Sequence, residues 1–591
     1  MLLVRLRVLV IKLRYNTCIY LSGIIMSIRL PIGYSNFKEI VDGGFNFVDK
    51  SLLIKEVIED VKAVLITRPR RFGKTLNMSM LHYFFDIRQD AAYLFKNLKI
   101  AQEQKLIADH QSQYPVIFLT FKDVKEDTYK AAYQKIVETI QMIYAEFSSV
   151  LLHSDKVDDF YKNKIIDILD GKAQQATIEN SIFLLSKCLH DHYGKQVCIL
   201  IDEYDTPVQM GYLNKYYTEI VGLFRNLLGA ALKDNPYLFK AVLTGILRVS
   251  KESFFSGLNN LIVYSMLSPE YSDYFGFTES EVSELLIKYN LQTKLEEMRR
   301  WYNGYQMGDH RIYNPWSIVN CITKKGICDI YWINTSNNDL IKYLLLKSTD
   351  AFKAEFEVLL SGRTVSQLID EYTAFPELET NESVVWSLFF MAGYLTVASW
   401  ERTRQGPLCQ LRIPNEEIGG LYCNIIEKWL TDGLGFQWYN TFINHLLDGD
   451  VAAFEAGLTA ILEKTVSMHD FDHAPESFYH GLLIGLTAGL YGQKGYQTKS
   501  NRESGYGRYD YMILSHLPDK PTILFEFKKV NLPKKKSVKE IKNILEKSAK
   551  EALAQIDTLG YLMEAKQQGA NNILKIGLAF CGKRFALVYQ C

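Results

Sequence analysis

The chain has 591 residues, of which 48% are hydrophobic and 23% charged, with 14 prolines and 36 glycines. This composition excludes collagen, low-complexity and largely disordered proteins, and the length predicts at least two domains. The 67 Lys and Arg residues balance the 67 Asp and Glu residues, which excludes a protein that is basic throughout but leaves local basic surfaces open.

Residues 1–27 form an apolar run that four basic residues interrupt, namely Arg5, Arg7, Lys12 and Arg14. A signal peptide or a membrane helix needs an unbroken apolar stretch, so we expect neither, and no stable membrane association. We interpret the segment as a disordered extension, or as sequence upstream of a true start at Met26; a weak membrane-surface helix is the remaining alternative. The nine cysteines include no Cys-x-x-Cys pair, which favours a reducing cytoplasm over a disulfide or zinc scaffold.

Between residues 28 and 267, short apolar runs alternate with segments of helical periodicity. The pattern predicts buried strands at 61–67, 116–121, 197–201 and 239–244, and helices at 74–87, 128–147 and 215–232. Strands that alternate with helices indicate an α/β fold with a parallel sheet covered by helices on both faces.

The loop after the first strand ends in Gly-Lys-Thr, the second half of a phosphate-binding loop. Gly73 lets the backbone approach phosphates, Lys74 reaches the β and γ phosphates, and the Thr75 hydroxyl binds Mg²⁺. Arg68 stands where the generic loop has its first glycine, so Gly-Lys-Thr alone is a weak signal. The flanking strand and helix strengthen it, and the sequence predicts ATP binding.

Two acidic residues end the third strand, where a P-loop ATPase needs them. Asp202 would hold Mg²⁺ through water, and Glu203 would act as the general base that activates the attacking water. After the fourth strand, Thr244 could sense the γ phosphate and Arg248 could offer a charge to the transition state. The alternative for Asp202 and Glu203 is an ordinary acidic strand end, and the alternative for Arg248 is a surface or ion-paired arginine. Arg70 and Arg71 likewise either contact phosphate or pair with acidic neighbours.

The segments 30–33, 47–50, 68–76, 201–207 and 244–251 resemble the bacterial AAA-ATPase-like family, whose own loop reads Arg-Pro-Arg-Arg-Phe-Gly-Lys-Thr. The resemblance covers about residues 28–265 and implies a P-loop NTPase domain at 28–267, with Asp49 and Lys50 near the nucleotide. The expected nucleotide-binding residues are Asp49, Lys50, Arg70, Arg71, Phe72, Gly73, Lys74, Thr75, Asp202, Thr244 and Arg248.

The pattern of residues 268–464 indicates a mainly helical connecting region. We expect it to transmit the effect of ATP binding or hydrolysis to the C-terminal domain, or to contact a partner. Within it, a helix at 384–392 precedes a hairpin made of 395–400 and 408–413, which predicts a winged-helix-like module.

Residues 465–591 contain a predicted hairpin with charged residues. Asp510 begins one strand, while Glu526 and Lys528 share a face of the return strand. Two carboxylates and a lysine suit metal-assisted phosphodiester hydrolysis: Asp510 and Glu526 would bind Mg²⁺, and Lys528 would orient the attacking water. The alternative is an edge hairpin with solvated charges.

Together with Glu476 and His480 before the hairpin, and Gln555 and a closing strand at 576–580 after it, this pattern resembles the PD-(D/E)xK nuclease superfamily. The resemblance implies a restriction-endonuclease-like α/β domain in which Glu476 is a further acidic residue of the Mg²⁺ site. A zinc site built from His469, His473, Glu476 and His480 is disfavoured, because Pro475 interrupts their helical spacing and the nuclease chemistry prefers oxygen ligands.

Residues 528–550 contain nine lysines and only two acidic residues, Glu540 and Glu546. This excess of positive charge indicates either a phosphate-contacting surface or a solvated helix. The leading hypothesis is an AAA-like ATPase, with ATP and Mg²⁺, coupled to a Mg²⁺-dependent nuclease that cleaves DNA under nucleotide control. The alternative is a nucleotide-dependent switch or assembly platform whose nuclease fold only binds nucleic acid or protein. A homo-oligomer is left open.

Overall fold

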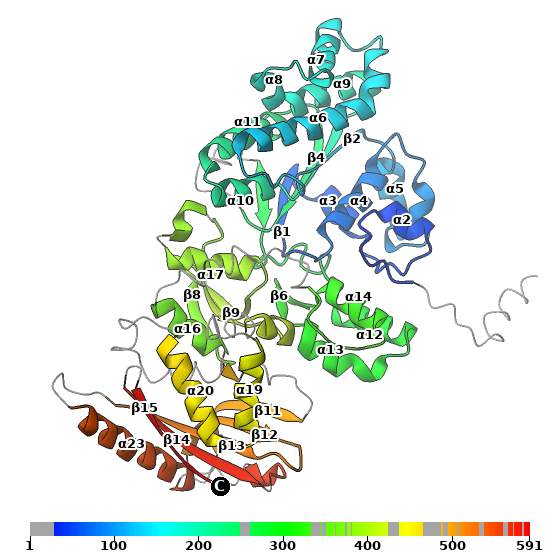
Figure 1. The fold of residues 1–591 in the computed structure, drawn as a ribbon. Coiled ribbons are helices and arrows are strands. Elements are labelled where there is room, and N and C mark those ends of the chain that lie inside the picture. The colour runs from blue at the N-terminus through cyan, green and yellow to red at the C-terminus, as the bar shows by residue number, and fades with distance from the viewer. Residues whose placement is uncertain are drawn as a thin grey trace, which may run out of the picture.

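The computed structural model describes residues 29–248, 260–332, 344, 350–360, 362–372, 375–379, 381–422, 436–464, 486–487, 495–504, 507–530, 537–558, 565–570, 572–581 and 584–591. The N-terminal α/β sheet lies toward one end of the molecule and the C-terminal sheet at the other (Figure 1). Within the described residues, no helix is long and apolar enough to cross a membrane.

The N-terminal sheet has five parallel strands in the order β2-β3-β4-β1-β5. They are β1 (Ala63–Thr67), β2 (Val116–Thr120), β3 (Val197–Asp202), β4 (Leu238–Gly245) and β5 (Leu261–Tyr264). The four predicted strands are confirmed, and β5 is an addition with only four residues. Because the strands are parallel, all their carboxyl ends meet at one edge, where open α/β sheets bind their ligands.

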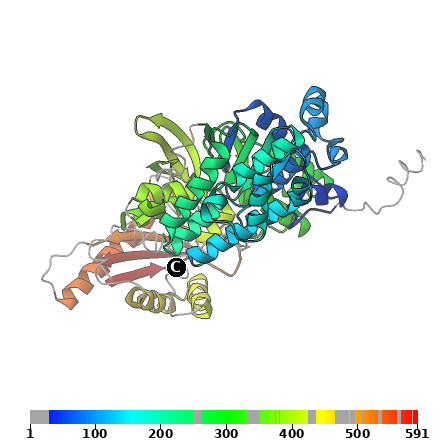
Figure 2. The same cartoon turned by 90° about the horizontal axis from the view of Figure 1, so that it is seen from above.

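Helices cover both faces of this sheet, as predicted, because alternate strand residues point to opposite sides. Val64 and Ile66 of β1 join the core with α2 (Phe37–Asp42), α3 (Leu53–Glu59) and α4 (Lys74–Phe85). Ala63 and Leu65 join the other core, which contains α6 (Tyr129–Leu152), α9 (Ser181–Tyr193) and α11 (Tyr217–Leu232). The remaining helices of this region are α5 (Gln104–His110), α7 (Asp159–Leu169), α8 (Gln175–Glu179) and α10 (Thr206–Leu213). Helices α6 to α9 lie together at the far end of the molecule, in the foreground of Figure 2.

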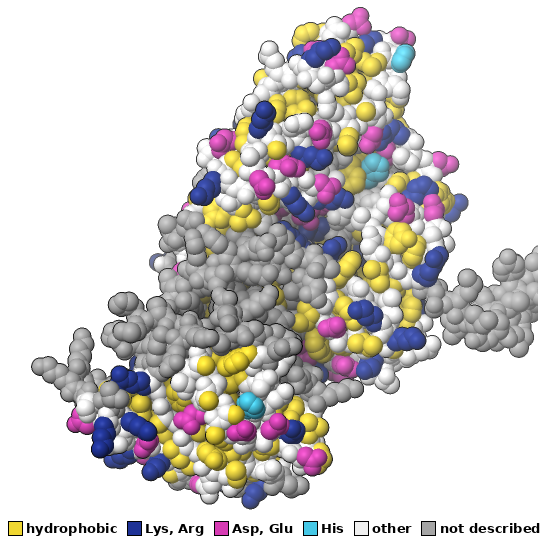
Figure 3. Space-filling model, in the orientation of Figure 1, with side chains coloured by type: hydrophobic (Ala, Val, Ile, Leu, Met, Phe, Trp, Pro, Cys, Tyr) yellow, Lys and Arg dark blue, Asp and Glu magenta, His cyan; other side chains and the backbone are white. Residues whose placement is uncertain are grey.

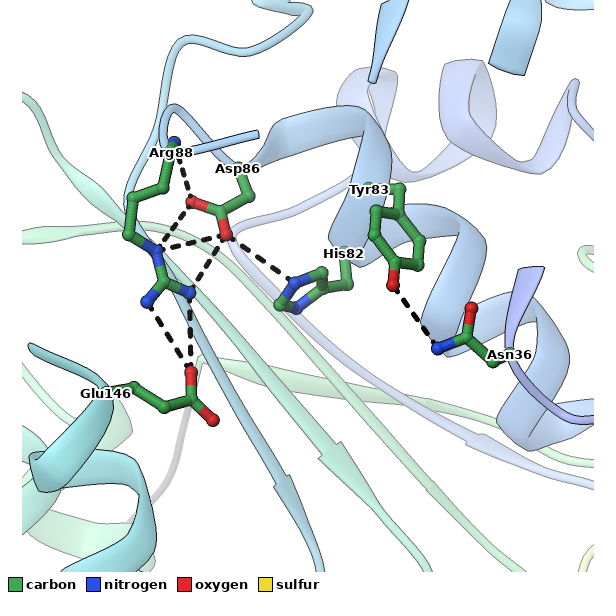
Figure 4. A network of polar contacts seen from close by, with 6 residues as sticks. All are labelled: Asn36, His82, Tyr83, Asp86, Arg88 and Glu146. Atoms are coloured by element: carbon green, nitrogen blue, oxygen red, sulfur yellow. Dashed lines mark hydrogen bonds and ion pairs between the residues drawn. The ribbon is translucent and has the colours of Figure 1, made fainter. Parts of the chain in front are cut away.

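A polar network holds the far end of helix α4 (Figure 4). Asp86 follows the helix and is fully buried, and Arg88 donates to both of its oxygens at 2.9–3.1 Å. Arg88 also reaches Glu146 of α6 at 3.5 Å and lies 4.0 Å above the ring of Phe147. On the same helix, the Tyr83 hydroxyl accepts a hydrogen bond from Asn36, at the start of α2. The helix that begins at the phosphate-binding loop is thus held firmly at its other end.

The middle region begins with three helices and a short hairpin, namely α12 (Glu279–Lys288), α13 (Leu295–Tyr302), β6 (Tyr305–Met307), β7 (His310–Ile312) and α14 (Pro315–Thr323). We call residues 268–323 the lid segment. A second module runs α16 (Asp350–Leu360), β8 (Val365–Leu368), α17 (Glu382–Met391), β9 (Thr396–Thr403) and β10 (Gly406–Arg412), with the strand order β8-β10-β9. The predicted helix and hairpin are present as α17, β9 and β10, and the succession of elements is consistent with the predicted winged-helix-like module, so we call residues 350–412 the winged-helix module.

The C-terminal sheet has the order β11-β12-β13-β14-β15, with β13 and β14 parallel and the other pairs antiparallel. Its strands are β11 (Tyr496–Ser504), β12 (Gly507–Ser515), β13 (Thr522–Lys529), β14 (Ile573–Cys581) and β15 (Arg584–Gln590). Helix α23 (Val538–Thr558) packs on one face, where Gly577 leaves room for the backbone at Ala549. Helices α19 (Phe436–Leu447) and α20 (Val451–Lys464) share a core with the opposite face.

Candidate nucleotide and nuclease sites

The phosphate-binding loop connects β1 to α4 as predicted. Gly73 has φ +87°, and no atom lies within 4 Å of the place where a Cβ would stand, so the backbone is open to a ligand there. The Lys74 ammonium donates to the carbonyls of Arg68 and Pro69, both at 3.1 Å, and lies 3.2 Å from the Glu203 carboxylate. These contacts hold the ammonium at the mouth of the loop, where it can exchange carbonyl partners for phosphate oxygens.

Asp202 is the centre of the polar contacts beside the loop. It is fully buried, and it accepts hydrogen bonds from the hydroxyls of Thr75 at 2.7 Å and Thr244 at 2.6 Å. Burial and the neighbouring Glu203 raise the pKa of Asp202, while the two hydroxyl bonds act against that rise. Glu203 has φ +52°, a left-handed conformation that is rare for a side-chain-bearing residue, and its carboxylate pairs with Lys74. Hydroxyl and carboxylate oxygens are the ligands that Mg²⁺ prefers.

A cavity of about 580 Å³ opens over these residues. This volume falls in the range of roughly 300–1,000 Å³ that small-molecule and cofactor sites occupy. Gly73, Lys74, Thr75 and Glu203 line its polar end. The segment 30–35 and six apolar side chains form its other end. Two of these side chains precede the parallel sheet in sequence and four belong to the lid segment, namely Phe47, Val48, Phe277, Leu285, Trp316 and Val319. A polar end for phosphates and an apolar end for a base together fit a nucleotide.

The C-terminal hairpin places the predicted acidic residues at one end of its ladder. Strands β12 and β13 pair from Ile513–Ile523 up to Tyr511–Phe525, and the next step would bring Asp510 opposite Glu526. Glu526 is 4% exposed, and Lys528, two residues further along the strand, is half-buried on the same face. The Asp510 side chain and the whole of Glu476 lie outside the described residues, so their positions remain predictions.

Comparison with known proteins divides the chain in the same way. Residues 31–255 match the family model described as "Predicted AAA-ATPase", and residues 474–590 match that of the PD-(D/E)XK nuclease superfamily. The chain carries an AAA-ATPase-like domain and a PD-(D/E)XK nuclease superfamily domain. An "Uncharacterized protein in vnfD 5'region" of Azotobacter chroococcum mcd 1 is 25% identical over 523 residues, which cover 87% of this chain and 92% of that protein. The similarity is therefore not confined to either domain.

Within the AAA-ATPase-like domain, Arg68 is a structural residue. Its guanidinium is fully buried and donates to five backbone carbonyls, those of Thr67, Tyr264, Ser265, Glu270 and Tyr271, at 2.8–3.3 Å. Burial lowers the pKa of Arg68 to about 9. The arginine that replaces the generic glycine thus ties the start of the loop to the chain that follows β5.

The next loop residues contact parts of the chain outside the parallel sheet. Pro69 packs against Gly393, whose missing Cβ would stand 2.9 Å from the proline ring. The Arg71 guanidinium lies 4.3 Å above the ring of Trp316, and burial lowers its pKa. Arg70 donates to Gln209 at 3.1 Å. These contacts connect the loop to the lid segment and to the winged-helix module.

Phe72 borders the cavity, but its ring is fully buried and packs edge-on against Tyr305 at 4.9 Å. Lys50 also borders the cavity, yet its ammonium donates to Glu281 at 2.7 Å, and burial lowers its pKa. Asp49 does not line the cavity; its oxygens accept from the backbone N–H groups of Ser51 and Lys99 at 2.9 and 2.6 Å. A direct contact of Phe72, Lys50 or Asp49 with nucleotide stays a prediction.

Arg248 lies in the loop after β4 and points to the winged-helix module. Its guanidinium stacks on the ring of Tyr372 at 4.0 Å, and it does not line the cavity. Asp205 fixes the start of this loop, because it accepts from the N–H groups of Ile246 and Leu247 at 2.9 Å. Burial raises the pKa of Asp205 to about 6. The loop that follows the sensor position is thus connected to a module more than a hundred residues away in sequence.

Sequence reasoning missed several residues of the cavity wall. Phe277, Leu285 and Trp316 come from the lid segment, and Lys122 and Lys125 come from the loop after β2. None of these residues belongs to a local motif. The only usable signal was the position of Lys122 directly after a predicted strand, at the sheet edge where ligands bind.

Proposed function

We propose that this protein is a cytoplasmic, ATP-hydrolysing enzyme that cleaves phosphodiester bonds in DNA with Mg²⁺ under nucleotide control. The observation that carries the ATPase half is a pair of linked contacts beside a nucleotide-sized cavity: Thr75 and Thr244 donate to Asp202, and Lys74 pairs with Glu203. Lys74, Thr75 and Glu203 line the cavity itself. When bound, Mg²⁺ and ATP supply the transferable phosphoryl group and a charge that stabilises its transfer.

The protein side chains have separate tasks in this reaction. Lys74 would exchange its contacts with Glu203 and the two carbonyls for phosphate oxygens, and Thr75 and Asp202 would hold Mg²⁺. Glu203 then loses its partner Lys74, so that its carboxylate is available to orient a water molecule and accept the proton from it. Thr244 keeps Asp202 oriented through its 2.6 Å hydrogen bond.

Lys74→Ala should weaken ATP binding by about tenfold to 100-fold, because the variant loses charged hydrogen bonds to phosphate. The measurement is titration calorimetry with the full-length protein, and the control is Lys130→Ala, an exposed lysine on α6 outside the cavity. Unchanged ATP affinity in Lys74→Ala would overturn the assignment of the nucleotide site.

The nuclease half is supported by Glu526 and Lys528 on one face of β13, at the end of the ladder that Asp510 adjoins. Helix α23 packs on this same face of the sheet, as the contacts of Met512 and Leu524 with Ile556 show. Lys and Arg side chains gather over this part of the domain (Figure 3), and the exposed lysines of α23 are Lys539, Lys542, Lys547 and Lys550. A positive surface on the helix that covers this face of the sheet is suited to a nucleic-acid backbone, with DNA as the favoured substrate.

Asp510→Ala and Lys528→Ala should each remove Mg²⁺-dependent cleavage, with rate losses of at least about 100-fold for the loss of one charged group in the reaction site. The assay uses single-stranded and duplex DNA and RNA. Asp519→Ala is the matched control, because Asp519 is an exposed acidic residue in the turn of the same hairpin. A wild type that cleaves none of these substrates with any divalent metal contradicts the nuclease half.

One observation favours the second candidate, a nucleotide-dependent switch whose nuclease fold only binds nucleic acid or protein. The Oε2 atom of Glu526 is fully buried, so one oxygen of this proposed metal ligand is shielded from solvent. The cleavage assay distinguishes the two candidates. A nuclease cleaves DNA, whereas for the switch the wild-type protein binds DNA without cleaving it.

A further inference from the structure

The loop after β2 presents two lysines to the polar end of the cavity. Thr120 of β2 pairs with Asp202 of β3, and Phe121 donates its N–H to the Asp202 carbonyl. Strand β2 ends at Thr120, so the loop that follows it starts next to Asp202 and Glu203. Lys122 and Lys125 both line the cavity and are both exposed.

The turn of this loop sorts its side chains. Phe121 and Val124 are buried at 0% and 1% exposure, and the Val124 N–H donates to the Phe121 carbonyl at 3.1 Å. With these two side chains anchored in the core, Lys122 and Lys125 are left on the cavity side. The acidic residues of the same loop, Asp123, Glu126 and Asp127, do not line the cavity, so the charge that reaches it from this loop is positive.

The other cations at the cavity are already engaged. Lys74 pairs with Glu203, Lys50 pairs with Glu281, Arg70 donates to Gln209, and Arg71 stacks on Trp316. Within the described part of the chain, neither Lys122 nor Lys125 forms an ion pair. Arg248, the residue from which a transition-state charge was expected, contacts Tyr372 instead.

We propose that Lys122 and Lys125 bind the terminal phosphate of the nucleotide and thereby make the site prefer ATP to ADP. The proposal rests on the proposed ATP site and adds residues from the loop after β2, a strand that flanks β3 on the side away from β4. A charge supplied there by the chain itself takes the place of one that would otherwise have to come from a second subunit.

The test measures the affinities of the full-length protein for ADP and for the non-hydrolysable analogue AMP-PNP by titration calorimetry. Lys122→Ala/Lys125→Ala should weaken AMP-PNP binding by about tenfold or more and change ADP binding by less than about twofold, because each lost charged hydrogen bond involves only the terminal phosphate. Lys122→Arg/Lys125→Arg should keep most of the preference. The control is Lys105→Ala/Lys130→Ala, which removes the same net charge from exposed positions outside the cavity.

The outcomes are distinguishable. Retained ADP binding in the double alanine variant shows that the cavity is folded, and an unchanged ratio of AMP-PNP to ADP affinity would then overturn the proposal while leaving the ATP site intact. An equal loss of preference in the Lys105 and Lys130 control would also overturn it, since the effect would then be long-range electrostatics. A wild type that binds neither nucleotide contradicts the proposed function itself.

Discussion

At the scale of single residues, the buried carboxylate of Glu417, shortly after β10, joins the chain that follows the winged-helix module to the end of the lid segment and to residues 331–332. It accepts hydrogen bonds at 2.7 Å from the N–H groups of Tyr331 and Trp332 and from the Ser317 hydroxyl. Burial raises its pKa from 4.5 to about 7, despite these three bonds. The folded protein therefore holds Glu417 mostly protonated below about pH 7, whereas an unfolded chain ionises it from about pH 4.5.

The raised pKa predicts that Glu417 makes the fold less stable as the pH rises. Its contribution is complete below about pH 4.5, where folded and unfolded chains are both protonated, and is lost as the pH approaches 7. The loss should amount to about 3 kcal/mol of unfolding free energy. Glu417→Gln keeps an amide oxygen for the two N–H groups and cannot ionise, so its stability should fall less between about pH 5 and 8.

Urea unfolding of wild type and Glu417→Gln across this pH range measures the effect. The difference between the two profiles isolates Glu417, because Asp205, whose pKa is also raised, is the same in both proteins. Parallel profiles would contradict the assignment of this pH dependence to Glu417.

At the scale of elements, the phosphate-binding loop is enclosed by three parts of the chain. Arg68 ties it to the segment after β5, Phe72 packs on the lid segment, and Pro69 packs on Gly393 between α17 and β9. Gly393 has φ +84°, and an added Cβ would lie 2.9 and 3.0 Å from two atoms of the proline side chain. A side chain at this position must displace the loop.

Gly393→Ala should therefore lower both stability and nucleotide affinity. Gly362→Ala is the matched control, since Gly362 lies in the same module at φ +80° with no atom within 4 Å of the added Cβ. Both variants should lose about 1–2 kcal/mol for the left-handed backbone, but only Gly393→Ala should weaken ATP binding. Equal ATP affinities would show that the Pro69 contact does not control the loop.

The winged-helix module also limits how the protein can contact DNA. In helix-turn-helix proteins the second helix enters the major groove, but here the corresponding α17 is buried from Val384 to Met391. This helix supports the core instead of reading bases. We infer that DNA contacts, including those of the proposed nuclease, come from other surfaces such as α23.

The sequence alone was sufficient to predict features that depend on residues close together in the chain. The β-branched runs predicted β1 to β4, and Gly-Lys-Thr with Asp-Glu assigned Thr75 and Asp202 to one proposed site, where the structure shows them hydrogen-bonded to each other. It was insufficient for the cavity walls, because Trp316 and Lys122 are brought there by tertiary packing and carry no local signature. Strand β5 escaped because four residues are too few for periodicity to separate a strand from a loop.

At the scale of the whole molecule, the proposed control of the nuclease by nucleotide would start from contacts between the AAA-ATPase-like domain and the winged-helix module. The loop after β4 reaches the winged-helix module through Arg248 and Tyr372, and Ser265 after β5 donates to Glu371 in the same module. We predict that ATP changes the DNA cleavage rate of the wild type and that Lys74→Ala keeps basal cleavage but loses the response. Asp510→Ala, which should be inactive with and without ATP, excludes a contaminating nuclease.

The buried Arg68 has a consequence for the thermodynamics of ligand binding. A glycine-rich loop is free to move before its ligand arrives, and binding must then offset the lost conformational entropy. Five carbonyl contacts fix the start of this loop during folding, so the ordering cost is met before any nucleotide is present. Replacing Arg68 with the generic glycine would restore the common motif, but the loop would be less ordered before binding and would bind phosphate with lower affinity.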